Sequence, residues 1–293
     1  MAKKVIRHIG DSQKNIIRMM DNVSARHSKW EVWNDFIVMS AISIANAFKG
    51  PYREEREERY LGLAGKYSGK ELEIIAAMFA EVVDAMDANP DQDFLGELFM
   101  ALGLGNEWAG QFFTPYDVCR VMARMSMAPD PGAEIQKKGW VAVSDPACGA
   151  GALLLAFANE CRREGINYQT SVLFVAQDID FLAGCMCYIQ MSLMGCPGYV
   201  VIDNTLTNPS VCYDRRGLIP QDKGNVWYTP MYFSDIWQWR RTFSQLDTPC
   251  RHSAEENPRE RPMPRADIRQ KAAPVPTDVP VHRETETGQL TLL

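Results

Sequence analysis

The chain has 293 residues, of which 46% are hydrophobic, and a formal net charge of −6 at pH 7. This length and composition are sufficient for one sizeable core or two modest ones. The acidic balance argues against an extended basic surface for nucleic acid, because such a surface binds phosphates through many Lys and Arg side chains. Contact with DNA would therefore depend on short basic pairs: Arg162-Arg163, Arg215-Arg216 and Arg240-Arg241.

The sequence favours a cytoplasmic protein without a membrane anchor. Residues 1–8 have no signal-peptide core, and the longest apolar run, Phe36 to Phe48, contains Ser and Asn and is too short to span a bilayer. The eight cysteines are then expected to be reduced thiols. No two of them have the Cys-x-x-Cys spacing and no His lies near them, so we predict no metal site.

Residues 1–108 are predicted to form a helical N-terminal domain. Apolar residues recur at helical spacing from Trp30 to Phe48, where Gly50-Pro51 ends the pattern, and again from Ser68 to Met86. The run of alternating charges from Arg53 to Arg59 is typical of a solvated helix face.

A glycine-rich turn follows further along the chain. The apolar run Trp140 to Ser144 leads into Asp145-Pro-Ala-Cys-Gly-Ala-Gly151, and a second apolar run, Ala152 to Ala158, comes after it. This order indicates strand, turn and helix, which is a nucleotide-binding context. No Lys-Ser or Lys-Thr follows the glycines, and the third glycine of the dinucleotide fingerprint is missing. Asp145 would repel a pyrophosphate but suits the ammonium of an amino-acid ligand.

Two further strands are predicted, and each ends in polar residues. Ser171 to Ala176 leads into Gln177-Asp178-Ile-Asp180, and Tyr199 to Ile202 leads into Asp203-Asn-Thr-Leu206. A carboxylate at the end of the second strand holds a ribose diol in such folds, and we favour Asp178 over Asp180 for this role.

These motifs resemble the adenine-specific (N6) DNA methyltransferases, in particular the modification subunit of type I restriction systems. Gly110-Gln-Phe-Phe-Thr-Pro115 resembles the first cofactor motif of that family, and the similarity extends over roughly residues 92–206. It implies a Rossmann-like α/β methyltransferase domain over residues 109–245, preceded by the helical domain, with S-adenosylmethionine as cofactor. The residues implied in cofactor binding are Phe113 and Thr114 at the methionine end, Asp145, Ala147, Gly149 and Gly151 in the loop, Asp178 at the ribose and Asn204 at the adenine.

The resemblance implies methyl transfer to the N6 amine of adenine in DNA, with a specificity subunit as partner. The Asn-Pro-Pro-Tyr/Phe motif of the family, which holds the flipped base, is absent. Asn208-Pro-Ser-Val211 follows the third strand too closely to replace it. Thr229-Pro-Met-Tyr232 lies at about the right distance, so Thr229, Pro230 and Tyr232 are the candidate catalytic residues, with impaired turnover expected.

About half of the family's sheet is also missing. After residue 232 only Phe233 to Phe243, a predicted helix, precedes the change in composition. Partner subunits would then supply the base pocket. The alternative function is a non-catalytic S-adenosylmethionine-binding accessory protein of a DNA modification or mobile-element system.

Residues 246–293 are predicted to be a disordered tail, because they are rich in Pro and charge and contain almost no large apolar residue. The final five residues, Gln289-Leu-Thr-Leu-Leu293, are the exception. They resemble the peptide by which bacterial replication and repair proteins bind the sliding clamp, with Gln289, Leu290, Leu292 and Leu293 as contacts. An incidental chain end is the alternative.

Overall fold

The structure, a computed structural model, divides into two compact units, Met1–Pro249 and Cys250–Leu293. The predicted boundary at residues 108 and 109 falls inside the first unit. The described residues are 10–24, 26–48, 50–103, 113–127, 131–210, 212–214, 217–247, 281–283 and 290–292.

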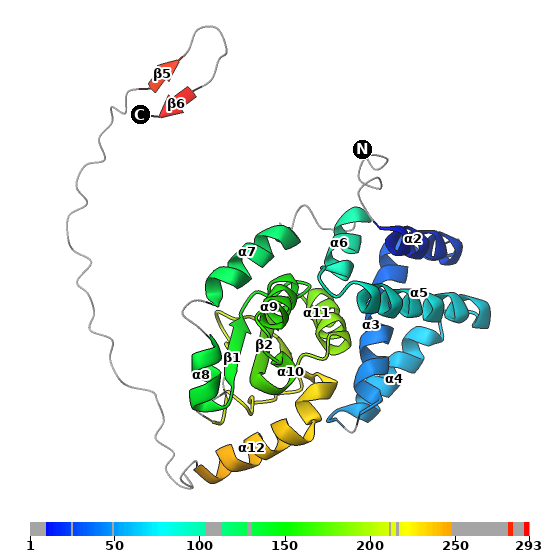
Figure 1. The fold of residues 1–293 in the computed structure, drawn as a ribbon. Coiled ribbons are helices and arrows are strands. Elements are labelled where there is room, and N and C mark those ends of the chain that lie inside the picture. Colours follow the sequence, from blue (N-terminus) through cyan, green and yellow to red (C-terminus); the bar gives the residue numbers. More distant parts are fainter. Residues whose placement is uncertain are drawn as a thin grey trace, which may run out of the picture. The chain divides into compact units, whose positions relative to one another are not determined.

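The first part of this unit is helical, as the sequence predicts (Figure 1). The Ser28 hydroxyl accepts a hydrogen bond from the Glu31 amide at the start of the second described helix. Ser68 and Glu71 form a capping box at the start of the fourth. These helices are α2 (Asp11–Val23), α3 (Lys29–Asn46), α4 (Arg53–Ala64), α5 (Gly69–Ala88) and α6 (Phe94–Ala101).

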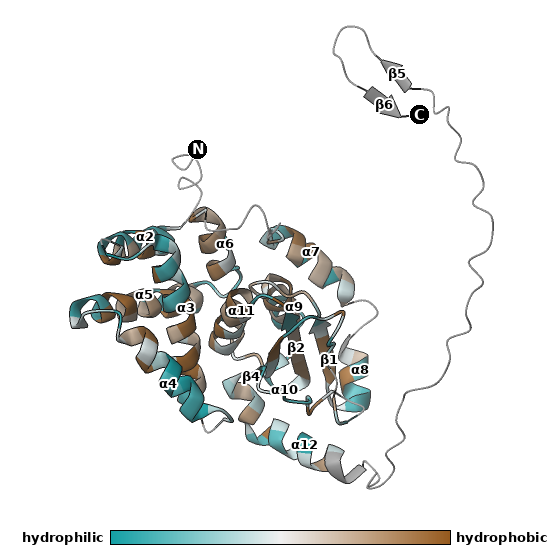
Figure 2. Ribbon diagram, turned by 180° about the vertical axis from the view of Figure 1, so that it is seen from behind, coloured by the Kyte–Doolittle hydropathy of each residue, from teal (hydrophilic) through white to brown (hydrophobic). Residues whose placement is uncertain are grey.

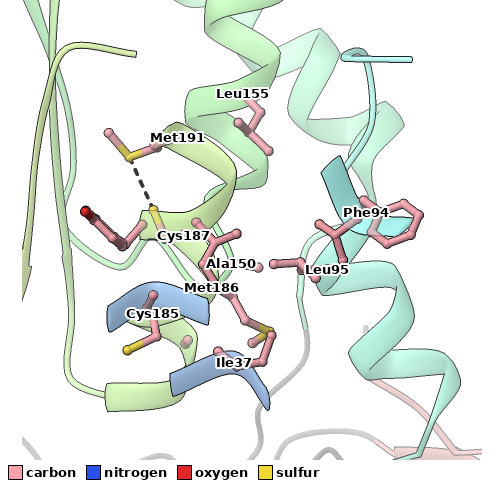
Figure 3. Packing of buried hydrophobic residues seen from close by; sticks show 14 of the residues in the cluster. Ile37, Phe94, Leu95, Ala150, Leu155, Cys185, Met186, Cys187 and Met191 are labelled. Atoms are coloured by element: carbon pink, nitrogen blue, oxygen red, sulfur yellow. Dashed lines mark hydrogen bonds between the residues drawn. The ribbon is translucent and has the colours of Figure 1, made fainter. Parts of the chain in front are cut away.

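Helix α3 is the centre of this part because it is apolar over most of its surface. Trp33, Ile37 and Ala41, which lie at helical spacing within the apolar run from Trp30 to Phe48, are fully buried. Ile37 lies beside Cys185 and Met186 of α11 (Phe181–Leu193), and Leu95 of α6 lies near the same helix (Figure 3). The helical part and the α/β part that follows it in the sequence therefore share one hydrophobic core.

The charge run on α4 is exposed, as the sequence predicts for a solvated face, except at Arg56. Arg56 is buried, and its guanidinium lies 4.2 Å from the centroid of the Trp227 ring. It donates hydrogen bonds to the carbonyls of Val226 (3.1 Å) and Pro51 (3.2 Å). Arg56 thus ties α4 to the last strand of the sheet.

The second part is a four-stranded sheet in the order β1-β2-β3-β4. Strands β1 (Val141–Asp145), β2 (Val172–Asp178) and β3 (Gly198–Ile202) are parallel, while β4 (Val226–Tyr228) is antiparallel to β3. Right-handed crossovers are the rule for such parallel units. The α/β fold class is as expected. The associated helices are α7 (Tyr116–Ser126), α8 (Pro131–Lys138), α9 (Ala152–Arg163), α10 (Tyr168–Ser171), α11, the 3₁₀ helix η2 (Pro230–Phe233) and α12 (Asp235–Asp247).

Different elements cover the two faces of the sheet. Helices α9 and α11 pack on one face, in the main hydrophobic cluster. Trp237 of α12 packs with Leu173 and Val175 in a smaller cluster on the other face. The apolar residues of the sheet and of α9 and α11 lie at the centre of the unit (Figure 2). Within the described residues, no strand pairs with the outer edge of β1. The described sheet is therefore smaller than the sheet of the family that the sequence resembles, in line with the sequence analysis.

The second unit contains one described element, an antiparallel pair of short strands. Strand β5 (Val281–Arg283) pairs with β6 (Leu290–Leu292), with His282 opposite Thr291. The composition of the tail does not predict this pairing.

Candidate functional site

The ends of the parallel strands bring the predicted cofactor residues to one edge of the sheet. Asp145 ends β1 and Asp178 ends β2, and the two strands are in register with Asp145 opposite Ala176. Strand β3 ends at Ile202 opposite Asp178. Ligands of open α/β sheets bind at this carboxyl edge.

The loop between β1 and α9 depends on glycines with positive φ, where other residues are strained. Gly149 has φ +54° and Gly151 has φ +96°. A Cβ on Gly149 would lie 3.0 Å from the Phe113 ring, and one on Gly151 would lie 2.9 Å from the Cys187 sulfur. Gly151 therefore allows α9 to start close to α11, while Gly149 keeps the loop open beside Phe113.

Asp178 holds the loop in place. Its Oδ2 accepts a 2.8 Å hydrogen bond from the Gly149 amide, and its Oδ1 accepts one of 2.9 Å from the Asp180 amide. A carboxylate has further lone pairs, so Asp178 can still accept from a diol. Asp180 instead caps α11 by accepting from the Ala183 amide.

Asp145 is a carboxylate in an unfavourable environment. Its Oδ1 accepts one hydrogen bond, of 3.1 Å, from the Ala147 amide. Burial is the main cause that raises the pKa of Asp145, and the charge of Asp178 raises it further, against the opposing effect of the Ala147 amide. A cationic group of a ligand would relieve this cost.

A cavity of about 220 Å³ lies between the loop and α7. Five of the predicted cofactor residues line this cavity: Phe113, Thr114, Asp145, Ala147 and Gly149. Gly151, Asp178 and Asn204 are not part of the lining. Gly110, Gln111 and Phe112 of the first motif are outside the described residues.

The cavity wall also contains residues that the sequence analysis missed, namely Asp93, Cys119 and Met122. Asp93 is buried, which raises its pKa, and it caps α6 by accepting from the Gly96 amide at 3.0 Å. The Gln190 side chain donates to Asp93 (2.8 Å) and to the Ala150 carbonyl (2.9 Å). The N-cap position of Asp93 before an apolar run was the available sequence signal, but its partner Gln190 is 97 residues away.

The turn after β3 is fastened to the glycine loop. The Thr205 hydroxyl donates a 2.6 Å hydrogen bond to the Pro146 carbonyl. The Asn204 side-chain oxygen accepts from the amides of Leu206 (2.9 Å) and Thr207 (3.2 Å), so it stabilises its own turn. Leu206 is 94% exposed at the tip. An adenine ring at this turn would find Leu206 as an apolar surface, whereas the Asn204 oxygen is already engaged.

The candidate catalytic residues Thr229, Pro230 and Tyr232 do not lie at this edge, which corrects their assignment. Because β4 is antiparallel, Tyr228 pairs with Tyr199 at the start of β3, and the 229–232 segment follows at the opposite edge of the sheet. Thr229 is fully buried, accepts from the Gly198 amide (3.0 Å) and donates to the Cys196 carbonyl (2.7 Å). Tyr232 is buried and donates to the Leu218 carbonyl at 2.6 Å. These contacts are structural.

Of the other remnant, Asn208-Pro-Ser-Val211, Val211 is outside the described residues, and the Asn208 amide is already engaged in hydrogen bonds beside the carboxyl edge of the sheet. Asn208 donates to Asp203 through Nδ2, and its Oδ1 accepts from Lys223 at 2.9 Å. The Asn204 amide and the side chains of Asn208 and Asn225 lower the pKa of Asp203. This network supports the turn.

Among the residues that the structure describes, no three His, Cys, Asp or Glu side chains gather where they could hold a metal ion. No helix in the described ranges is both long and apolar enough to cross a membrane.

The fold and the loop define an α/β domain with a glycine turn at the carboxyl edge of its parallel strands. Residues 101–245 match the family model of the N-6 DNA methylases. No match was found among curated proteins.

Two solved structures are similar over part of the chain. The methyltransferase subunit of a type I restriction-modification system from Streptococcus thermophilus has 23% identity and a TM-score of 0.33, and the match covers 54% of this chain and 33% of that one. A protein described as a class I S-adenosylmethionine-dependent methyltransferase from Listeria monocytogenes has 15% identity and a TM-score of 0.37, with 80% and 79% covered. The chain thus spans about a third of the length of the first of these proteins.

Proposed function

We propose that this chain binds S-adenosylmethionine at the glycine loop and takes part in methylation of the N6 amine of adenine in DNA. The observation that carries the proposal is the loop itself, in which Gly149 faces the Phe113 ring and Asp178 holds the Gly149 amide. This loop lies within the segment that matches the N-6 DNA methylase family.

The residues present fit this cofactor. Asp145 lies in the cavity as an under-compensated carboxylate that can pair with the cofactor's ammonium, and Phe113 and Thr114 line the same cavity. Asp178 lies beside the loop, where it can accept from the ribose, and Leu206 offers an apolar contact at the far end. When bound, the cofactor supplies an electrophilic methyl group. The chain's residues orient it and exclude water from its amino-acid end.

The base pocket is the missing part. An adenine must leave the duplex and find acceptors for its amine, and Thr229 and Tyr232 are buried at the other edge of the sheet. Beside the cofactor loop, β1 has no strand on its outer side within the described residues. We therefore propose that turnover requires a partner, with a specificity subunit and DNA as the candidates. The same observation favours the second candidate function, a non-catalytic cofactor-binding accessory protein.

Calorimetric titration with S-adenosylmethionine and with its demethylated product tests the cofactor proposal. Binding should be in the micromolar range and should weaken about 10-fold or more in Asp178→Asn, because one carboxylate oxygen becomes a donor. Asp87→Asn, on the exposed side of α5, is the matched control and should bind normally. Absence of binding by the unmodified chain would overturn the proposal.

Methyl transfer to unmethylated DNA then separates the two candidate functions. Transfer that appears only when a specificity subunit is added supports a methyltransferase completed by its partner. Cofactor binding without transfer in any mixture supports the accessory protein. In either case the reduced cysteines fit action in the cytoplasm.

The tail carries a separate proposal, that its last residues bind the sliding clamp. Its support is sequence resemblance alone. Leu290 and Leu292 belong to β6, while Gln289 and Leu293 are outside the described residues.

A further inference from the structure

Helix α7 has two apolar faces, of which only one is packed. Tyr116, Cys119 and Ala123 are buried in the main hydrophobic cluster, on the side of α7 that packs against α9. The opposite side consists of apolar residues that are open to solvent. These four residues, the α7 stripe, are Val118 (48% exposed), Val121 (60%), Met122 (44%) and Met125 (72%).

The α7 stripe is continuous, because positions i, i+3, i+4 and i+7 lie on one side of a helix. Helix α7 lies on the outside of the unit beside α9 (Figure 1). A helix that is apolar on both sides is normally buried, and a contiguous exposed apolar surface usually marks an interface. Met122 also lines the cofactor cavity, so whatever covers the stripe closes that cavity on its α7 side.

We infer that the α7 stripe is the docking surface for a second copy of this chain, which packs its own α7 antiparallel against the first. The commonest homo-oligomer is a two-fold dimer in which the same patch meets itself. A two-fold axis between Val121 and Met122 places Val118 opposite Met125 of the second copy and Val121 opposite its Met122. Every residue of the stripe then has an apolar partner.

The charges beside the stripe are also self-complementary. Asp117 and Arg124 are seven residues apart and therefore lie on the same flank of α7. A two-fold axis maps this flank onto itself and brings Asp117 within about 3 Å of axial rise from Arg124 of the second copy. Both side chains are largely exposed, Asp117 with Arg120 at 3.6 Å and Arg124 with Glu160 at 3.6 Å. Arg120 is turned toward Asp91 (3.9 Å), away from the stripe.

An interface of one short helix from each copy is small, so the dimer is weak and forms at micromolar or higher concentration. Its consequence for the cofactor rests on the proposed function. Closing the cavity at Met122 should make cofactor binding and dimerisation favour each other, since coupling between two sites is reciprocal.

Sedimentation velocity of the full chain without cofactor tests the surface directly, and its result does not depend on the proposed function. At about 100 µM the chain should be largely dimeric, and Val121→Glu should shift the dissociation constant at least 10-fold toward monomer. The matched control is Leu61→Glu, an exposed apolar residue of α4, which should leave the dimer unchanged. A chain that is monomeric at this concentration would overturn the inference and indicate that another segment or protein covers the stripe.

A charge exchange tests the antiparallel geometry. Asp117→Arg places two Arg side chains at each contact of the dimer, and Arg124→Asp places two Asp side chains there. Each variant alone should dimerise at least 5-fold more weakly, while an equimolar mixture should recover the dimer, because both contacts in the mixed species then join Arg to Asp. Thermal melting checks that both variants are folded. Failure of the mixture to recover would overturn the antiparallel arrangement.

Discussion

At the scale of single residues, Gly149 combines two constraints that can be separated. An alanine there is strained at φ +54° and also meets the Phe113 ring, whereas Gly165 has a similar φ of +71° with nothing within 4 Å of its missing Cβ. The strained φ should cost each Ala variant about 1 kcal/mol of stability. Only Gly149→Ala should also weaken cofactor binding, by about 10-fold or more, in a calorimetric titration. Equal binding by the two variants would show that the cofactor does not need this loop.

The half-buried carboxylate of Asp145 should lower the stability of the fold but strengthen cofactor binding. Its pKa is raised above the usual carboxyl value, mainly by burial, so stability falls as the pH rises past the usual value and the loss is complete above the raised pKa. Asp145→Asn should therefore melt at a higher temperature at pH 7 and bind the cofactor more weakly. Asp145→Asn that binds like the unmodified chain would exclude the ammonium contact.

The same carboxylate sets the pH dependence of binding. Affinity should fall as the pH drops through the raised pKa of Asp145, because protonation removes the partner of the ammonium. It should also fall above about pH 8, where a free α-amino group loses its proton. Titrations between pH 4 and pH 9 should give a bell-shaped curve, and Asp145→Asn should remove its acidic limb. An acidic limb that persists in this variant would assign the titration to another group.

At the scale of elements, the antiparallel direction of β4 places the 229–232 segment at the opposite edge of the sheet from the glycine loop. Thr229→Val removes hydrogen bonds to Cys196 and Gly198 inside the core and should cost about 1–3 kcal/mol in chemical denaturation. Cofactor affinity should not change, because the residue lies at the opposite edge of the sheet. Loss of methyl transfer in a variant that remains fully stable would instead support a role for Thr229 in the base pocket.

At the scale of the whole molecule, the two units predict separable properties. Removal of residues 250–293 should leave the melting temperature and the cofactor affinity unchanged, since the core and the site lie in the first unit. Removal of residues 289–293 alone should abolish co-purification with the sliding clamp. Equal recovery of the clamp with and without these five residues would make them an ordinary chain end.

The sequence by itself determined the features that depend on neighbours along the chain. Helices α3 and α5, the three parallel strands and the strand-turn-helix at Gly149 follow from local periodicity and from glycines at a tight turn. The match of residues 101–245 to the N-6 DNA methylase model contains motifs of the same kind. Each of these signals lies within about twenty residues.

Only the tertiary structure decided the features that depend on distant residues. The run of alternating charges predicted a solvated Arg56, but this side chain is buried against Trp227, 171 positions further along the chain. Motif spacing placed Thr229 at the active edge, but antiparallel pairing with β3 carried it to the other. Asp93 lies in the cavity wall, where it accepts a hydrogen bond from Gln190, 97 residues further along the chain. In each case the stabilising contact comes from a residue that folding brings close. No local sequence pattern specifies which distant residue a side chain will contact.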